Sequence, residues 1–186
     1  MKVIQTHLEG CIIIEPKVFG DKRGFFLETF HENRYLEVAG IRERFVQDNR
    51  SRSTKDVLRG LHFQKTKPQG KLVSVTMGEV FDVAVDLRPE SKTFGEYKSV
   101  ILSEKNKLQF YVPPRFAHGF VVLSDIADFQ YKCTDYYDPT DEEGILWEDI
   151  DISIDWPTKK PILSNKDLNL PLFKNIRSKI LNGWKE

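Results

Sequence analysis

The stretch KLVSVTMGEVFDVAVDL, residues 71–87, decides the fold class. It contains two runs rich in apolar residues, 71–77 and 80–87, separated by the turn signal Met77-Gly78-Glu79. Short apolar or alternating runs of this length are typical of β-strands, and glycine marks the turn because it adopts backbone conformations that strain other residues. The stretch therefore predicts two successive strands.

The same pattern continues on both sides of this stretch, from Gly10 to about Tyr137. Further strand-like runs, separated by turn residues, occupy residues 11–15, 24–29, 57–64, 97–102, 109–112, 119–123 and 127–134. Many short runs at close intervals are typical of an antiparallel β-sandwich or barrel. The sequence thus predicts an all-β fold with its core over residues 10–137.

Two helices are expected at the periphery of this β core. Residues 32–39 end at Gly40, which has the position of a C-terminal cap, and residues 172–184 carry apolar side chains at Phe173, Ile176, Ile180 and Leu181. A chain of 186 residues has the ordinary size of one compact domain. We therefore expect a single domain, residues 1–186, in which residues 138–186 pack on the core.

Composition and charge argue against several classes of protein. The chain is 40% hydrophobic, and its 28 basic residues balance 28 acidic ones, which is typical neither of a disordered chain nor of a polycationic nucleic-acid-binding surface. Cys11 and Cys133 are too few for a disulfide framework and indicate buried thiols in a reducing compartment. Because no signal peptide or membrane-length apolar run is recognisable, we expect a cytoplasmic protein that binds neither nucleic acid nor membrane.

The four histidines are the natural candidates for acid-base chemistry, because imidazole titrates near physiological pH. His62 lies in a strand-like run, and His118 follows a turn-rich stretch and precedes an apolar strand. Residues three apart on a regular strand face opposite sides, so Arg59 and His62 share a site only if Gly60 introduces a bulge. On these segments alone, each histidine can equally be structural: a hydrogen-bonded core residue for His62, and a strand-end residue for His118.

Metal binding is the competing hypothesis, since two histidines on a small β fold can join a carboxylate around a metal ion. The spacing does not support it, because the chain has no His-x-His pair and no acidic residue among residues 63–67, which follow His62. The neighbouring lysines also repel a dication. The sequence therefore predicts no metal site.

Eight motifs occur in one order along the chain. They are DKRGFF (21–26), QDNRS (47–51), RGLHFQ (59–64), GKLV (70–73), VPP to HGF (112–120), YKC (131–133), Glu142 with Gly144 and Trp147, and LSNKD (163–167). Together they resemble the dTDP-4-dehydrorhamnose 3,5-epimerase family, over nearly the whole chain from Gly10 to about Pro171. The resemblance implies a cupin-type jelly roll, a homodimer, and an activity that needs neither a metal nor an organic cofactor.

The resemblance also implies roles for four residues in proton transfer. His62 matches the base that removes protons next to a ketone, and Asp167 matches the carboxylate that orients this base and stabilises its imidazolium form. Lys71 matches the cation that stabilises the enolate oxygen, and Tyr131 matches the acid that returns a proton on the opposite face. By local sequence alone, Asp167 is a helix-cap or turn aspartate, Lys71 is a solvated strand-end lysine and Tyr131 is a sheet tyrosine.

Nine further positions match residues that the family uses to bind its substrate. Arg59 and Arg23 are expected at the diphosphate, because guanidinium groups suit phosphate oxygens. Tyr137 is the preferred aromatic platform for the base, with Tyr136 as the alternative. The remaining matches are Gln47, Asn49 and Glu28 at the nucleotide, and His118, Glu142 and Lys166 in the same pocket. Because family members contribute the amino-terminal arginine and glutamate across a dimer interface, Arg23 and Glu28 are expected to serve the partner's site.

The sequence is thus interpreted as an isomerase that converts dTDP-4-dehydro-6-deoxy-D-glucose to dTDP-4-dehydro-L-rhamnose by two epimerisations, in the formation of activated L-rhamnose. The nearest alternative is a related enzyme that inverts one carbon or uses another nucleotide-sugar. A non-catalytic cupin that binds a sugar-nucleotide is the second, although it would not need to retain His62, Tyr131 and Asp167. A metal-dependent cupin oxygenase is the third.

Overall fold

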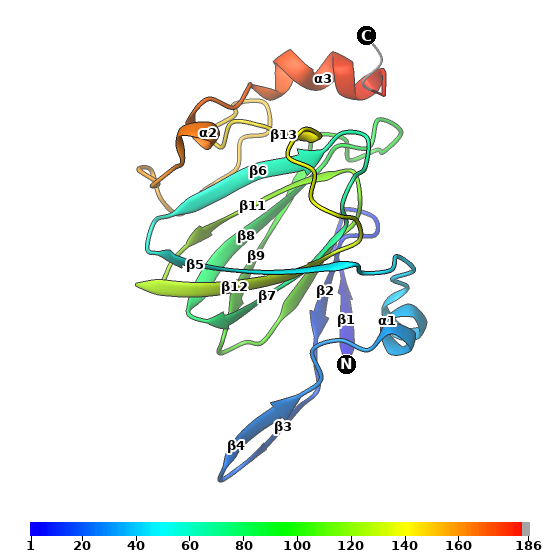
Figure 1. The fold of residues 1–186 in the computed structure, drawn as a ribbon, viewed down its shortest axis with the longest axis vertical. Coiled ribbons are helices and arrows are strands. Elements are labelled where there is room, and N and C mark those ends of the chain that lie inside the picture. Colours follow the sequence, from blue (N-terminus) through cyan, green and yellow to red (C-terminus); the bar gives the residue numbers. More distant parts are fainter. Residues whose placement is uncertain (184–186) are drawn as a thin grey trace.

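The computed structural model describes residues 1–183, whose regular structure is mainly antiparallel strands in two facing sheets (Figure 1). The six-stranded sheet has the spatial order β1 (Lys2–Gln5), β2 (Ile12–Glu15), β10 (Gln109–Val112), β7 (Lys71–Met77), β12 (Ile126–Cys133) and β5 (Gln47–Thr54). The five-stranded sheet has the order β13 (Glu142–Gly144), β6 (Leu58–Gln64), β11 (Phe116–Val122), β8 (Glu79–Asp86) and β9 (Tyr97–Ser103). The expected all-β jelly roll is confirmed.

An apolar core fills one part of the space between the sheets. The six-stranded sheet contributes Val73, Val75, Phe110, Ala127 and Phe129, and the five-stranded sheet contributes Val80, Ala84, Val100, Leu102, Phe120 and Val122. Each of the larger side chains stabilises the fold by about 1.5–3 kcal/mol when it leaves water. This core holds the two sheets together and leaves the remaining space between them for polar groups.

The turn at Gly78 carries the chain from one sheet to the other. β7 pairs with β10 and β12, whereas β8, which follows directly, pairs with β11 and β9. Gly78 has φ +75°, and a Cβ atom there would lie 2.1 Å from the carbonyl oxygen of Ile126. Only glycine fits this corner, which explains the turn signal between the two runs that predicted strands.

The predicted strands are found, with ends that shift by a few residues. One shift changes the environment of a candidate residue: β11 begins at Phe116 rather than Gly119, because it pairs on one side with β8 as far as Phe116 and on the other with β6. His118 therefore lies inside a strand, and the structural alternative of a strand-end histidine does not apply.

Four strands, β1, β3 (Val18–Asp21), β5 and β13, were not predicted. The most consequential is β5, whose sequence QDNRSRST has no apolar residue. β5 pairs with β12 along its whole length but has a free edge, and its inner side chains face a polar cavity rather than the apolar core. Neither face of β5 requires hydrophobic residues, so the alternation that reveals other strands is missing.

The helices lie at the periphery, as expected. The helix α1 (Glu32–Ala39) ends at Gly40 in the left-handed conformation, which confirms the predicted C-terminal cap. The helix α3 (Phe173–Leu181) buries Phe173, Ile176 and Ile180 but leaves Leu181 exposed, because the helix turns Leu181 away from that face. The end predicted for this helix, Trp184, lies outside the described residues.

Residues beyond β12 pack on the outer side of the five-stranded sheet. An apolar cluster joins Leu58, Leu61, Val83, Val85 and Val121 of that sheet to Ile145, Ile152, Trp156, Phe173, Ile176 and Ile180 of the C-terminal segment. The cluster holds the short helix α2 (Asn165–Leu168) beside β6. Within residues 1–183, no helix is long and apolar enough to cross a membrane.

The hairpin of β3 and β4 (Gly24–Leu27) projects away from the two sheets (Figure 1). The strand predicted at residues 24–29 is thus the second arm of a ribbon whose first arm is β3. Phe25 and Phe26 at its end are 63% and 68% exposed, although Lys107 lies 4.5 Å above the Phe25 ring. Phe26 lies 6.4 Å from Phe19 on the other arm, and Lys17 lies 4.9 Å above the Phe19 ring, so these rings contact one another and two lysines but remain largely exposed.

Candidate active site

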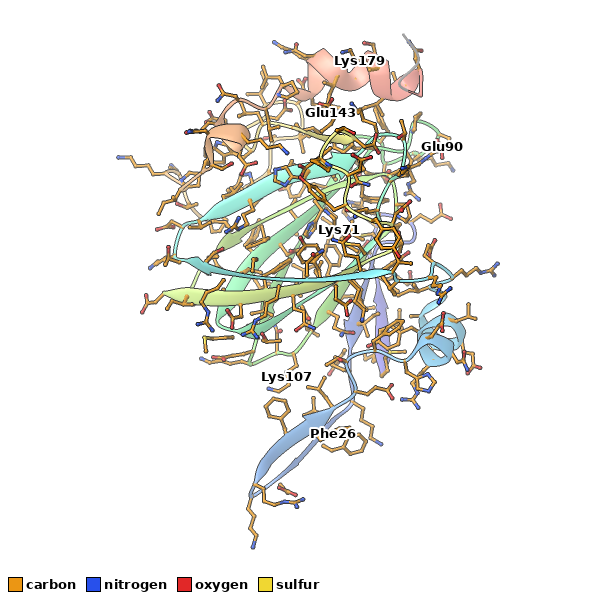
Figure 2. All side chains as sticks on the ribbon, viewed as in Figure 1. Phe26, Lys71, Glu90, Lys107, Glu143 and Lys179 are labelled. Carbon is orange, nitrogen blue, oxygen red and sulfur yellow. The ribbon has the colours of Figure 1, made fainter. Side chains whose placement is uncertain are left out.

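A cavity of about 420 Å³ lies between the two sheets, next to the apolar core. Strands β5, β7 and β12 form one wall, β6 and β11 form the other, and β13 and α2 add residues at the side. Figure 2 shows Lys71 between the sheets. Most of its lining residues have polar side chains, and the lining comprises Gln47, Asn49, Ser51, Arg59, His62, Gln69, Lys71, His118, Phe120, Phe129, Tyr131, Tyr137, Glu142, Ser164, Lys166 and Asp167.

A bulge in β6 allows Arg59 and His62 to face this cavity together. Along the β6–β11 pair, His62 lies opposite His118, and Arg59 lies opposite Phe120, so the register shifts between them. Gly60 has φ +122°, and a Cβ there would lie 2.6 Å from the Cα of Gly119. The bulge on which a shared site for Arg59 and His62 depends is therefore present at Gly60, and it turns both side chains into the cavity.

His62 and Asp167 are joined by a hydrogen bond. The Nε2–H of His62 donates to Asp167 Oδ1 at 2.5 Å, and the Ser164 hydroxyl donates to Asp167 Oδ2 at 2.9 Å. Burial alone would raise the pKa of Asp167, but the contacts with His62, Ser164 and Lys166 together lower it. The carboxylate is thus ionised at neutral pH and fixes a tautomer of His62 in which Nδ1 carries the lone pair.

Tyr131 stands on the wall opposite His62, because it belongs to β12 of the six-stranded sheet whereas His62 belongs to β6 of the other. Burial raises the pKa of Tyr131, and the charges of Cys133 and Glu142 add to this effect. The phenol is therefore protonated at neutral pH. One wall thus carries the lone pair of His62 Nδ1, and the opposite wall carries the phenolic hydrogen of Tyr131.

Lys71 lies at the start of β7 and faces the cavity, so it is not the solvated strand-end lysine that its local sequence suggests. Desolvation lowers its pKa, while Cys133, Glu142 and Asp82 act in the opposite direction. An ammonium group in such surroundings interacts strongly with any negative charge that develops nearby. Lys71 can therefore stabilise an oxyanion between the walls.

His118 is held by Asp82, a buried residue that the sequence analysis missed. The Nε2–H of His118 lies 3.0 Å from both carboxylate oxygens of Asp82. Burial lowers the pKa of His118 despite this carboxylate. A signal was present, because Asp82 is the single charged residue in the otherwise apolar run Val80-Phe81-Asp82-Val83-Ala84-Val85.

The polar residues of β5 and the adjoining loop form the other part of the cavity. Tyr137 donates its backbone N–H to Gln47 Oε1 at 2.9 Å, and the Gln47 amide donates to Asn49 Oδ1 at 3.1 Å. Arg59 reaches across and donates to the Ser53 hydroxyl at 3.1 Å. Tyr137 lines the cavity, and Tyr136, which is 65% exposed, does not.

Arg23 and Glu28 do not reach this cavity. Arg23 is at the turn of the projecting hairpin and pairs with Asp21, and Glu28 pairs with Arg34 at the start of α1. All the other predicted site residues line the cavity. Missed lining residues include Ser51, Gln69 and Ser164. Ser51 and Ser164 belong to two of the eight motifs, and Ser164 has the spacing of a helix cap three residues before Asp167, but neither signal indicated a place in the cavity.

No group of three histidine, cysteine, aspartate or glutamate side chains within residues 1–183 is arranged to hold a metal ion. His62 approaches Asp167 and, at 3.7 Å, Glu142, but Lys166 pairs with Glu142. This arrangement joins a base to carboxylates and cations and suits proton transfer.

The sequence matches the family model of dTDP-4-dehydrorhamnose 3,5-epimerase over residues 5–175. The chain belongs to this epimerase family. It is 54% identical to the dTDP-4-dehydrorhamnose 3,5-epimerase of Escherichia coli K12 over 184 residues, which cover 97% of the chain and 100% of that relative.

Solved structures of other family members share the fold. The dTDP-6-deoxy-D-glucose-3,5-epimerase of Legionella pneumophila, in complex with dTDP-4-keto-L-rhamnose, superposes with a TM-score of 0.93 at 55% identity, covering 97% of this chain and 96% of that one. A 3'-monoepimerase of Streptomyces bikiniensis, in complex with dTDP-quinovose, superposes with a TM-score of 0.88 at 28% identity, covering 96% and 93%. The epimerase fold thus supports more than one pattern of inversion.

Ser164 provides a test of how the epimerase positions its carboxylate. Ser164→Ala removes both the N-terminal cap of α2 and the hydrogen bond to Asp167 Oδ2. We expect the free energy of unfolding to fall by about 1 kcal/mol, as for a lost helix cap. We expect kcat to fall roughly tenfold to a hundredfold, because a displaced Asp167 no longer aligns His62. Urea denaturation and initial rates measure the two effects.

Ser164→Thr is the matched control, because it retains a hydroxyl at the cap position and should keep both stability and rate. A Ser164→Ala enzyme that is less stable but has the kcat of the wild type would show that Ser164 caps α2 without aligning Asp167.

Proposed function

We propose that this epimerase converts dTDP-4-dehydro-6-deoxy-D-glucose to dTDP-4-dehydro-L-rhamnose by inverting C3 and C5, a step towards dTDP-L-rhamnose. The observation that carries the proposal is the placement of the His62–Asp167 pair and Tyr131 on opposite walls of one cavity, with Lys71 beside it. Inversion needs a base on one face of the sugar and an acid on the other. The family relationship supplies the identity of the sugar-nucleotide.

In the proposed reaction, Nδ1 of His62 removes the proton from a carbon next to the C4 ketone, while Asp167 stabilises the imidazolium that forms. The electron pair of the broken C–H bond moves into the ring, and negative charge develops on the C4 oxygen. Lys71 stabilises this charge, and it does so more strongly in the transition state than in the ketone. Tyr131 then donates its phenolic proton to the same carbon from the other face, which inverts the centre.

The polar end of the cavity is proposed to bind the dTDP group. Arg59 offers a guanidinium to the diphosphate, and Gln47 and Asn49 offer amide groups. Tyr137 is the proposed platform for the base, supported by its place in the lining. His118, Glu142 and Lys166 complete the binding surface, and the positive charge at the reacting oxygen comes from Lys71 rather than from a metal or an organic cofactor.

Solvent exchange tests the reaction directly. When the wild-type enzyme acts on dTDP-4-dehydro-6-deoxy-D-glucose in deuterated water, we expect deuterium at both C3 and C5, detected by NMR. His62→Ala should label neither carbon, because a positioned base contributes about 10²–10⁴ in rate. Label at one carbon alone would instead identify a monoepimerase, and binding without any exchange would identify a non-catalytic sugar-nucleotide protein.

Tyr131→Phe separates proton removal from inversion. The substitution keeps the ring and deletes only the hydroxyl, so it opens no large cavity. We expect deuterium still to enter the substrate, because His62 can return a proton to the face from which it came, while the yield of inverted product falls roughly a hundredfold. Tyr136→Phe, outside the cavity, is the control. Normal inversion of both carbons by Tyr131→Phe would exclude this tyrosine as the acid.

We also propose that the 186 residues form one domain and act as a homodimer in the cytoplasm, a reducing compartment that fits the unpaired Cys11 and Cys133. The exposed aromatic hairpin supports a dimer, because Phe25 and Phe26 project from the subunit and would be buried by a second copy. Arg23 and Glu28, which do not line their own cavity, would then enter the partner's site.

Mixing two inactive variants tests this exchange between subunits. Arg23→Ala should impair binding of the diphosphate, and His62→Ala should abolish proton removal. In a mixed dimer, one site combines an intact His62 with the intact Arg23 of the partner subunit. An equimolar mixture after subunit exchange should therefore recover about a quarter of the wild-type sites. If no mixing ratio of the two variants restores activity, although mass spectrometry demonstrates mixed dimers, Arg23 lies outside the partner's site.

A further inference from the structure

His62 has a carboxylate at each of its two ring nitrogens. Asp167 accepts from Nε2 at 2.5 Å, and Glu142 Oε1 lies 3.7 Å from Nδ1. Asp167 follows from the proposed mechanism, whereas Glu142 approaches the nitrogen that must take the proton of the substrate. β13 places it there, because Glu142 pairs in register with Gln64, two residues beyond His62 on β6.

The second oxygen of Glu142 is held at the edge of the cavity. The Tyr137 hydroxyl donates to Oε2 at 2.7 Å, and the Lys166 ammonium pairs with the same oxygen. The Glu142 side chain is only 12% exposed, whereas the side chain of Lys166 is 50% exposed. Glu142 therefore connects a largely enclosed base with groups that touch solvent.

A small cavity lies beside His62 and Glu142. It has a volume of about 20 Å³ and is lined by His62, Tyr137 and Glu142, together with Lys71, Gln64, Gln69 and Phe63. A space of this volume accommodates a single water when several polar groups surround it. One such molecule, or a modest approach of the carboxylate to the imidazolium, completes a path for a proton.

Inversion of two centres makes such a path necessary. Each inversion leaves His62 with an extra proton on Nδ1 and leaves Tyr131 as a phenolate. The second inversion cannot begin until His62 has lost its proton and Tyr131 has regained one, while the sugar still covers the space between them. The reaction therefore needs an exit for the proton of His62 that does not cross the substrate.

We propose that Glu142 is this exit and relays the proton from Nδ1 of His62 to solvent between the two inversions. The imidazolium gives its proton to the Glu142 carboxylate, directly or through one water, which yields neutral imidazole and a carboxylic acid. The acid then releases the proton to solvent water beside Lys166 and Tyr137. A proton from solvent restores the phenol of Tyr131. Glu142 acts through His62, so this inference rests on the proposed role of His62.

The charge state of Glu142 agrees with this role. Burial alone would raise its pKa, but the contacts with Lys166, Tyr137 and His62 lower the pKa overall. Glu142 is therefore an ionised acceptor at neutral pH, and its protonated form is short-lived. Tyr137 is a donor to the carboxylate, since this hydrogen bond raises the pKa of Tyr137 to about 12.

Glu142→Gln tests the relay, because the amide can keep the contacts with Lys166 and Tyr137 through its carbonyl oxygen but cannot accept and release a proton in the same way. With enzyme in excess and rapid quenching, we expect the first carbon to exchange and invert, while the singly inverted sugar accumulates. We expect kcat to fall about tenfold to a hundredfold. Added imidazole or formate should restore the rate in proportion to its concentration.

Glu143→Gln is the matched control. Glu143 is the next residue on β13 (Figure 2). It pairs with Lys65 at 3.1 Å and does not line the cavity. It should have the wild-type rate and the wild-type ratio of singly to doubly inverted sugar.

Two results would overturn the relay. One is a Glu142→Gln enzyme with a higher KM but an unchanged product ratio and no rescue by small acids, which would limit Glu142 to binding. The other is loss of exchange at both carbons without rescue, which would make it a structural support of His62. Failure of the proposed function would be recognised separately, because the wild-type enzyme would then label one carbon only or neither.

Discussion

A hydrogen bond between His62 and Asp167 joins two parts of the chain that lie 105 residues apart. Its formation requires that the C-terminal segment pack on the five-stranded sheet, through the apolar cluster that includes Ile145, Trp156 and Phe173. That packing places α2 beside β6, and α2 then supplies Asp167 to one nitrogen of His62 and Lys166 to the carboxylate near the other. The chemistry of the imidazole thus depends on hydrophobic burial on the far side of the sheet.

On several strands the inward-facing side chains are apolar at one end and polar at the other, and this divides the space between the sheets into an apolar core and a polar cavity. On β7, the inward side chains run from Val75 and Val73 to Lys71, and on β12 they run from Phe129 to Tyr131. On β11, the sequence passes from Phe120 to His118. The dry part of each strand holds the sheets together, and the polar part lines the cavity. The same backbone hydrogen bonds therefore fix both the core and the positions of the reacting groups.

The sequence predicted those parts of the molecule that an apolar pattern or a motif marks. The strand-like run around His62 pointed to Gly60 as the place where a bulge was needed, and the strands on either side of Gly78 followed from glycine and from periodicity. β5 did not, because a strand with a free edge and a polar inner face needs no hydrophobic residue. Asp82 was missed because its partner, His118, lies 36 residues away in the sequence. Ser164 was missed although its partner, Asp167, is only three residues away, because a serine that caps a helix gives no sign of a role in the cavity. The path from Glu142 to His62 emerges only when β13, α2 and β6 are seen together.

The corner at Gly78 also shapes the order in which the molecule can assemble. The two strands that it joins are neighbours in the chain but belong to different sheets, so they do not form a local hairpin with each other. β7 can pair only after β10 and β12 have been synthesised, because both follow it in the sequence. Bringing distant segments together costs conformational entropy before any stabilising contact between them has formed, and folds rich in such contacts fold slowly. During synthesis, the apolar strands of the incomplete sheet therefore remain unpaired and exposed until the last strands pair with them.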